Sequence, residues 1–327
     1  MNRLFGYIAW AILTLFLLSL DAPVAFSKNI ELVAPFSDFS LREPPDPPPP
    51  GSPQFYSSTA VISPWSIVQW NVPGGKLPPF TLTRQGPRTS FHSRAAEVAV
   101  EIQRESGQTS VQLSQNGEAL PCSWANGHPR ESDLFIAPKD PRWSGHDTAL
   151  HPYARSLSIG ALSALILRAE VSAEAAPLSR PKGCAVSQGA AIVALILRNT
   201  TGPKPQILFY QLALNHVCGP GSAQRMRQCA VGQTKFTYFS RKQPFGVDDF
   251  APLLGVPALG NGQSRHITIN LLPRLAQIIA AGPPEMDRNM AHWQFDGTYL
   301  GQHIWGDIRL ATRWRSFGLT AVTSTGQ

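Results

Sequence analysis

The stretch that decides the fold of this chain is Ile207-Leu208-Phe209-Tyr210-Gln211-Leu212-Ala213-Leu214-Asn215. Successive side chains of a β-strand point to opposite faces of its sheet. One face of this predicted strand is apolar and consists of Leu208, Tyr210, Leu212 and Leu214. The other face is mixed and consists of Phe209, Gln211, Ala213 and Asn215. The pattern therefore predicts a strand that buries one face in a core and presents an amide between aromatic and polar neighbours on the other.

Four more segments have the composition of β-strands. Ala164–Val171 and Ala190–Arg198 are nearly continuous apolar runs, a pattern typical of strands that are covered on both faces. Ala96–Gln103 and Thr109–Ser114 alternate between apolar and polar residues, as half-buried strands do. Asn116-Gly117 follows the last of these strands and predicts a tight turn.

One helix is predicted near the C-terminal end. Its apolar residues recur at helical spacing and are Leu271, Leu272, Leu275, Ile278 and Ile279. Asn270 is placed to cap its start, Pro273 falls in the first turn, where proline is tolerated, and Gly282-Pro283 ends it. Many strands and one helix predict an all-β sandwich with one short helix on its outer face.

The N-terminus has the features of a secretory signal peptide. Arg3 precedes an apolar run from Leu4 to Leu20, and the small residues Ala25 and Ser27 suit a cleavage after Ser27. We therefore expect residues 1–27 to be removed on export to the periplasm or the extracellular space. An uncleaved membrane anchor is the alternative, because the run approaches the roughly 20 residues that span a bilayer.

The rest of the chain divides into a spacer and one domain. Residues 43–53 are rich in proline, which lacks an amide donor and fixes its own φ, so residues 28–54 are predicted to form an extended spacer. Residues 55–327 are predicted to form a single β-sandwich domain. We expect a monomer that meets a membrane only through its signal segment.

The mature chain keeps four cysteines, and an even number in an exported protein predicts two disulfides. Three pairings are open. We favour Cys218 with Cys229, which closes a short loop rich in glycine and proline, together with Cys122 and Cys184. The cysteine spacings do not resemble a zinc site.

Charge and motifs argue against several classes of function. The formal net charge is +7, but the Lys and Arg residues are scattered, which argues against a nucleic-acid partner. His146 and His151 have no third ligand nearby in the sequence, so neither a metal nor a cofactor is predicted. The chain has no Gly-x-Ser-x-Gly elbow and no cysteine–histidine signature, so covalent hydrolysis lacks a nucleophile.

The most specific pattern lies in Trp293–Asp307 and the following segment Ile308–Phe317. By strand parity, one face of these segments is apolar and carries Ile304, Ile308, Leu310 and Trp314, with Trp314 assigned to the core. The other face is polar and carries His303, Trp305, Asp307, Arg309, Arg313 and Arg315. Gly306 is a position at which this register can change.

The order of segments in about the last 60 residues resembles that of glycoside hydrolase family twelve, the endoglucanases and xyloglucanases with a concanavalin-A-like jelly roll. Members of that family end with a short helix, a strand reading Trp-Tyr-Leu, a segment like Gly-Phe-Glu-Ile-Trp, then Gly-Leu-Ala-Thr and Ser-Phe-Ser. The corresponding segments here are the Leu271–Ala281 helix, Tyr299-Leu300, Gly301–Gly306, Leu310–Thr312 and Ser316-Phe317. The resemblance implies a jelly-roll β-sandwich.

The catalytic positions of that family differ in this chain. The acid/base glutamate of the Gly-Phe-Glu-Ile-Trp segment would correspond to His303, and the nucleophile glutamate of a Glu-Leu-Met-Ile-Trp strand would correspond to Gln211. A retaining glycosidase needs two carboxyl groups roughly 5–5.5 Å apart. The resemblance therefore implies a sugar-binding groove from which both catalytic acids are missing.

The first hypothesis is an exported, non-catalytic β-sandwich that binds a polysaccharide or glycan and derives from a glycosidase. Its predicted ligand-binding residues are Gln211, His303, Trp305, Asn215, Phe209, Asp307, Trp65 and Trp70. An active glycoside hydrolase that uses a displaced carboxylate, Asp307 or Asp296, is the alternative. A structural envelope protein without a ligand is the third reading.

Overall fold

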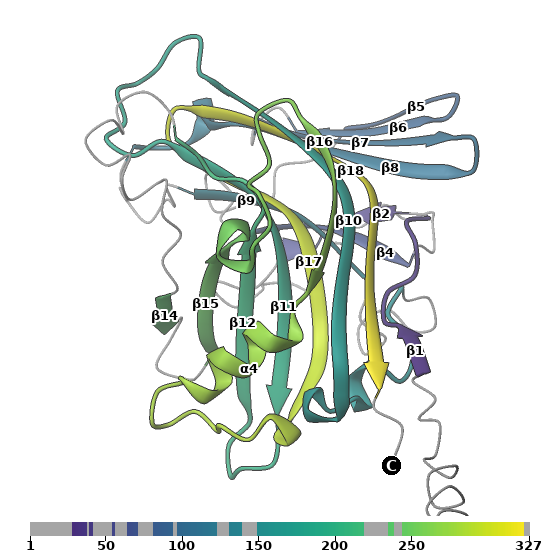
Figure 1. Cartoon of the computed structure of the whole chain (residues 1–327). Helices are drawn as coiled ribbons and strands as arrows, with labels where there is room; N and C mark the ends of the chain where they lie inside the picture. Colours follow the sequence, from purple (N-terminus) through teal and green to yellow (C-terminus); the bar gives the residue numbers. More distant parts are fainter. Residues whose placement is uncertain are drawn as a thin grey trace, which may run out of the picture.

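The structure is a computed structural model that describes residues 28–37, 39–41, 54–55, 64–70, 81–93, 97–122, 131–138, 149–218, 235–238 and 244–323. Within these residues the chain forms two β-sheets that lie face to face as a sandwich, as predicted (Figure 1). No helix of the described part is long and apolar enough to cross a membrane. The predicted signal segment, residues 1–27, lies outside the described residues.

The first sheet has eight strands in the order β16-β10-β18-β8-β7-β6-β5, with β1 paired to β18. Their bounds are β1 Lys28–Glu31, β5 Thr81–Gln85, β6 Arg88–Ser93, β7 Val98–Glu105, β8 Gln108–Asn116, β10 Leu162–Pro177, β16 Ser264–Asn270 and β18 Ile308–Thr323.

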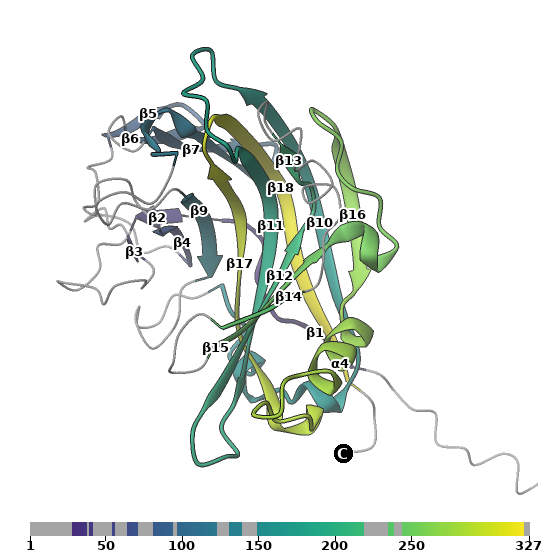
Figure 2. The same ribbon diagram turned by 90° about the vertical axis from the view of Figure 1, so that its left-hand side faces the viewer.

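The second sheet has ten strands in the order β14-β15-β12-β11-β17-β9-β4-β2, with β13 paired to β11 and β3 to β4. Their bounds are β2 Phe39–Leu41, β3 Gln54–Phe55, β4 Trp65–Trp70, β9 Glu131–Pro138, β11 Gln188–Asn199, β12 Gln206–Ala213, β13 Val217–Cys218, β14 Lys235–Tyr238, β15 Pro244–Phe250 and β17 Trp293–Trp305. The long strands β11, β17 and β18 bend along their length (Figure 2).

The main core lies between the sheets, and the parity predicted for β12 is confirmed. The four apolar residues of its predicted inner face, Leu208, Tyr210, Leu212 and Leu214, all belong to this core. Strand β11 is covered on both faces, as predicted, because Val193 and Leu195 join the main core while Ile192 and Ala194 join a second buried cluster on the opposite face. The expectation for β10 was wrong: its residues alternate, with Leu167 buried and Arg168 exposed, so only one face is covered.

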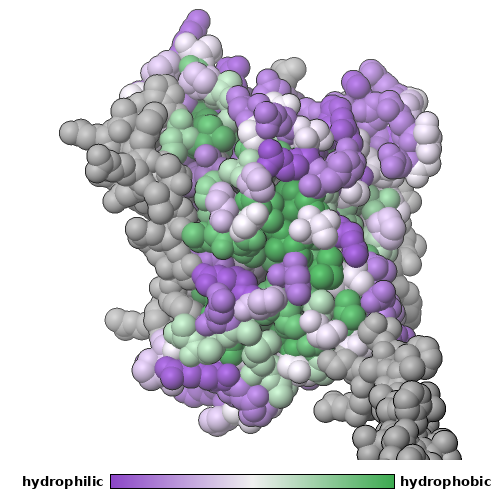
Figure 3. All heavy atoms as spheres, in the orientation of Figure 1, coloured by the Kyte–Doolittle hydropathy of each residue, from purple (hydrophilic) through white to green (hydrophobic). Residues whose placement is uncertain are grey.

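The predicted helix is α4, Leu272–Ala280. Its buried residues Leu275, Ile278 and Ile279 join the main core. Asn270 Oδ1 accepts hydrogen bonds from the backbone N–H groups of Leu272 and of Leu165 on β10, at 3.2 and 3.1 Å. On the face of the molecule in Figure 1, hydrophobic residues gather above α4 and hydrophilic residues surround them (Figure 3).

Arg274 on α4 also holds the helix to the ten-stranded sheet. Its Nε and Nη2 donate to the two carboxylate oxygens of Asp249 on β15, at 2.7 and 2.9 Å. Burial and the charge of the Asp249 carboxylate raise the pKa of Tyr210 well above its usual value, so its phenol stays protonated. The helix is thus bonded to both sheets, through Asn270 to β10 and through Arg274 to β15.

The segment expected to be a spacer contributes strands to the sandwich. Lys28–Glu31 pairs antiparallel with the end of β18, and Phe39–Leu41 pairs parallel with β4. Phe36 packs edge-on against Trp65, with ring centroids 5.0 Å apart. The proline run at 43–53 lies outside the described residues. Residues 28–37 and 39–41 are therefore part of the sandwich, and the prediction of an extended spacer was wrong for them.

The tight turn was predicted in the wrong place. Asn116 ends β8 and begins a short 3-10 helix, where its Oδ1 accepts the N–H of Glu118 at 3.2 Å. The hairpin turn joins β7 to β8 at Ser106-Gly107, and both of its residues have positive φ, 49° and 80°. Serine gave only a weak turn signal there, whereas Asn-Gly is a strong one.

The disulfide Cys122–Cys184 is present, as predicted, and links two residues 62 positions apart. Cys218 is also disulfide-bonded. Its predicted partner Cys229 lies outside the described residues.

Candidate functional site

The candidate site is formed where β9 pairs with β17. His303 on β17 lies directly opposite Asp133 on β9, and Trp305 lies opposite Glu131. Because side chains alternate along both strands, all four point away from the main core, on the outer face of the ten-stranded sheet. One donor atom each from Glu131, Asp133 and His303 lies within 4.8 Å of the donor atoms of the other two. We call these three residues the acid–imidazole cluster.

The local sequence explains why β9 presents its acids outward. Leu134 and Ile136 are fully buried in the main core, so the alternate residues Asp133 and Glu131 face the other way. Gly301 lies opposite Phe135 with a φ of 153°, and a side chain there would meet the β9 backbone, with the Phe135 Cα only 2.8 Å from an added Cβ. The glycine therefore allows β9 to approach β17 closely beside the cluster.

The carboxylates of the acid–imidazole cluster affect the pKa of the neighbouring Tyr299. Burial is the main cause that raises the pKa of Tyr299, and the charges of Asp133, Asp248 and Glu131 raise it further. Gln211 Nε2 donates to the Tyr299 hydroxyl at 2.7 Å. Gln211, Tyr299 and the two acids of the cluster therefore share one face and one electrostatic environment.

A second imidazole lies beside the cluster. His216 follows β12 and is partly buried. Burial, together with the nearby His303, lowers the pKa of His216 to about 4. The ring is therefore neutral at pH 7, and the outer face carries two adjacent histidines.

Gln211 is on the predicted face, but it does not lie opposite His303. Its register partners are Ala194 on β11 and Asp248 on β15, and its amide bonds to Tyr299. Tyr299 and His303 are four residues apart on β17, which corresponds to about 13 Å along a strand. The expected pair of an amide and an imidazole at the catalytic positions was therefore wrong, because strand register offsets the two residues.

The part of the outer face around Gln211 is closed. Phe135 and Tyr299 are buried, with ring centroids 4.9 Å apart, and Phe209 packs against the same second cluster. Tyr299 is only 4% exposed. The part around His303 differs, since Glu131, His303 and Trp305 are all partly exposed. A ligand on this face would meet the His303 end first.

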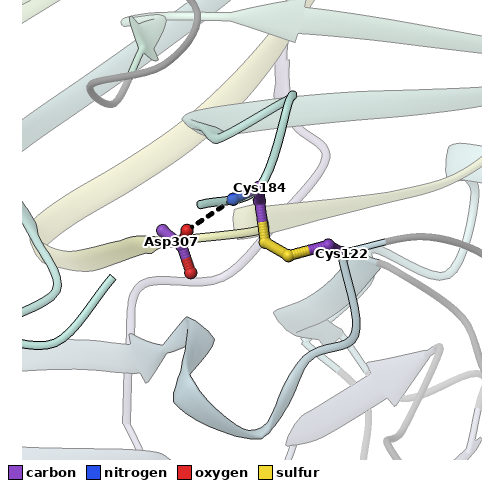
Figure 4. A group of neighbouring side chains, drawn as sticks. All are labelled: Cys122, Cys184 and Asp307. Atoms are coloured by element: carbon purple, nitrogen blue, oxygen red, sulfur yellow. Dashed lines mark hydrogen bonds between the residues drawn. A yellow bond between two sulfur atoms is a disulfide. The ribbon is translucent and has the colours of Figure 1, made fainter. Parts of the chain in front are cut away.

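Asp307 does not belong to the site, which corrects its expected role as a ligand or displaced acid. Its carboxylate is 2% exposed and its Oδ2 accepts the backbone N–H of Cys184 at 2.8 Å, next to the disulfide (Figure 4). Its Oδ1 lies 3.9 Å from Lys182 Nζ. Gly306 has a φ of 68°, which turns the chain and ends the alternation of β17. Although Asp307 lies close to Cys122 and Cys184, both sulfurs are in the disulfide and are not metal ligands.

Two more predicted ligand residues are structural. Asn215 is 1% exposed, and its Oδ1 accepts the N–H of Ala191 at 2.6 Å, so it continues the ladder of β11 in place of a backbone carbonyl. Trp65 is fully buried in the main core, and its Nε1 donates to the Pro35 carbonyl at 3.3 Å. Both were expected on an open face, but each is enclosed by neighbouring strands.

Two predicted residues remain, Trp70 and Asp296. Trp70 pairs with Asp133 through the backbone, and its side chain lies outside the described residues. Asp296 is seven positions from His303 on β17 and lies 3.6 Å from Arg155 Nε, so it is remote from the cluster. Neither of the expected displaced carboxylates is therefore near His303.

Glu131 and Asp133 were not among the site residues predicted from the sequence. The segment 131–138 carries a usable signal, since Ser132, Leu134 and Ile136 alternate with Glu131 and Asp133. That alternation predicts a half-buried strand with acids on its outer face. It does not predict the partner strand, because Asp133 and His303 are 170 positions apart.

The chain is similar, at low identity, to solved structures of endoglucanases and a xylanase. It is similar to endoglucanase 3 of Trichoderma harzianum from family GH12, at 9% identity over 91% of this chain and 98% of that one, with a TM-score of 0.40. It is also similar to the endo-1,4-β-glucanase CelB2, at 11% identity over 76% of this chain and 97% of that one, with a TM-score of 0.37. The family 11 xylanase of Neocallimastix patriciarum is 8% identical over 78% of this chain and 96% of that one, with a TM-score of 0.34. No protein-family model matches the chain, and no curated protein matches it.

Proposed function

We propose that this chain is an exported carbohydrate-binding β-sandwich that binds a polysaccharide or glycan at the His303 end of its ten-stranded sheet and does not cleave it. The observation that carries the proposal is the set of side chains that share this end. The acid–imidazole cluster lies beside the partly exposed indole of Trp305 on one face. Carboxylates accept hydrogen bonds from hydroxyl groups, and a neutral imidazole both accepts and donates them. An indole face packs against the apolar C–H groups of a sugar.

The two acids lie about as close together as those of a retaining glycosidase, but their placement on a single strand argues against hydrolysis. Retaining glycosidases hold their two carboxyl groups about 5–5.5 Å apart and inverting ones about 6.5–9.5 Å apart, with the scissile bond between them. Here both acids come from one strand, two residues apart, and their nearest oxygens lie within 4.8 Å of each other and of the imidazole. Three groups that converge on one point favour binding over attack from two sides of a bond.

Export is part of the proposal. It rests on Arg3, the apolar run from Leu4 to Leu20 and the small residues before position 28. The disulfide Cys122–Cys184 supports it, because disulfides persist in oxidising compartments.

A structural role is the second candidate, and one observation favours it. Phe135, Tyr299 and Ile192 are buried on the same outer face, so its middle is occupied by the chain's own side chains. A protein of this kind would bind no glycan at all.

A glycan array probed with the purified protein, run beside a reducing-sugar release assay on each glycan that binds, tests the proposal. We expect binding without release, and His303→Ala should abolish or strongly weaken binding. His266→Ala is the matched control, because His266 lies exposed on β16 of the other sheet. Release of reducing sugar would overturn the proposal in favour of a hydrolase, and an array without any bound glycan would favour the structural role.

A further inference from the structure

The acid–imidazole cluster is also a set of metal ligands. We propose that Glu131, Asp133 and His303 form a binding site for one divalent transition-metal ion of the Zn²⁺ class. The inference goes beyond glycan binding, because it concerns the protein and the ion alone. It also departs from the sequence-based prediction that the chain binds no metal. That prediction rested on His146 and His151, whereas the ligands proposed here come from two strands that are distant in the sequence.

The distances suit a metal that draws its ligands together. Zinc lies about 2.0–2.2 Å from imidazole nitrogens and carboxylate oxygens, which places the ligand atoms of a tetrahedral site about 3.4 Å from one another. The three donor atoms here lie within 4.8 Å of one another. Small side-chain rotations therefore bring them to bonding distance, and Glu131 and His303 are partly exposed and so free of tight packing on one side.

The donor types select the ion. Calcium and magnesium are held by oxygen atoms, whereas imidazole suits zinc, copper, iron and nickel. One imidazole and two carboxylates make a mixed nitrogen and oxygen set, and three protein ligands leave a fourth position of a tetrahedron for water. The set therefore resembles an open zinc site more closely than a closed structural one.

The charges at the cluster also favour a cation. Glu131 and Asp133 are like charges on the same face of one strand, and Asp133 is only 6% exposed. Two carboxylates at such a separation repel each other, and a dication between them offsets the repulsion.

A nitrogen near the cluster supplies a second, independent sign of a ligand. His216 Nε2 is buried and has no hydrogen-bond partner among the described residues. Buried polar atoms in native proteins are nearly always satisfied, by protein, by water or by an ion. The pairing of Val217 with Gly189 places His216 next to Ala190, whose partner on β17 is His303, so a ligand held at the cluster is a suitable partner for this nitrogen.

The test is a metal titration of the purified protein after removal of metals with a chelator. Zn²⁺ is titrated in competition with a chromogenic chelator, and Co²⁺ is added in a parallel experiment to read the visible absorption of its coordination shell. We expect one equivalent of Zn²⁺ to bind tightly and Co²⁺ to give a spectrum of low coordination number. His303→Ala should weaken Zn²⁺ binding at least tenfold, and His266→Ala should leave it unchanged.

Glu131→Gln keeps the experiment interpretable if His303→Ala does not fold. Glu131 is partly exposed at the end of β9, so this isosteric change removes a ligand charge with little effect on packing. It too should weaken Zn²⁺ binding at least tenfold. Equal affinities for Glu131→Gln and the unchanged protein, or no stoichiometric binding by the unchanged protein, would overturn the metal site. Either result leaves the glycan array unaffected, so the two proposals fail separately.

Discussion

Removal of the disulfide Cys122–Cys184 should destabilise the fold by a predictable amount. The bond closes a loop of 62 residues, and the chain-entropy relation for a loop of that length gives about 4 kcal/mol at 25 °C. The perturbation is the double variant Cys122→Ala with Cys184→Ala, because chemical reduction would also break the bond of Cys218. A loss of about 4 kcal/mol changes the unfolding equilibrium nearly a thousandfold.

The native contacts beside the bond separate two explanations of this loss. The Cys184 N–H donates to Asp307 Oδ2 at 2.8 Å, and both groups remain in the double variant. The disulfide is therefore expected to act mainly on the unfolded chain, which expands when the cross-link is removed. Such an expansion raises the slope of unfolding free energy against urea concentration.

Equilibrium unfolding in urea, followed by tryptophan fluorescence, measures both quantities. We expect the free energy of unfolding to fall by about 4 kcal/mol and the slope to rise. Glycan binding should persist in the absence of urea, because the pairing of β9 with β17 that brings the acids to His303 involves neither cysteine. A loss below about 1 kcal/mol with an unchanged slope would refute the reasoning, since it would show that the loop is already restrained by other contacts.

Three further predictions concern single residues. Arg274→Met should lower the unfolding free energy by about 3 kcal/mol in urea titrations, because Asp249 is 3% exposed and loses both of its charged hydrogen bonds; adding Asp249→Asn should recover part of the loss. The hydrogen bond from the Asn289 N–H is the largest of the causes that lower the pKa of Asp287 to about 2. The ionised carboxylate should therefore contribute its full share of the unfolding free energy above about pH 4, and that share should be lost between about pH 4 and pH 2. Asp287→Asn should flatten this fall in acid titrations followed by circular dichroism. Gly301→Ala should cost at least about 2 kcal/mol in thermal or urea unfolding, because its Cβ would meet the backbone of β9, whereas Gly318→Ala, in open space on β18, should cost less than about 1 kcal/mol.

The sequence predicted the features that depend on local pattern. The alternation in Ile207–Leu214 was read correctly because a strand's two faces differ within a few residues. Strand parity likewise put Ile304, Ile308, Leu310 and Trp314 on one apolar face, with Trp314 in the core, and all four are at most 1% exposed. The helix α4 was found within one residue at each end, because its apolar spacing and its flanking Asn270 and Gly282 are local signals.

The candidate site needed information that no local pattern holds. Strand parity predicted Asp307 on the same face as His303, but the positive φ of Gly306 turns the chain, and the carboxylate is buried against Cys184. Gln211 and His303 were assigned to the two catalytic positions of the resembled family by the order of their segments. In the structure, a register offset along β17 separates them. Glu131 and Asp133 were missed because their importance comes only from the pairing of β9 with β17.

The position of β17 in the sheet gives the candidate site a particular dependence on complete folding. β17 lies between β9 and β11, so its last residues pair with 131–136 on one side and with 188–193 on the other. Without β17, the acids of β9 have no imidazole beside them. Because β17 is the second-last strand of the chain, it enters the sheet only after nearly all of the other strands have been synthesised. Pairings of such long sequence separation form slowly and late, since loop-closure entropy opposes them until they are made. The acid–imidazole cluster therefore exists only in the closed sandwich, and a ligand or metal ion that binds it stabilises the completed fold over every partly folded form.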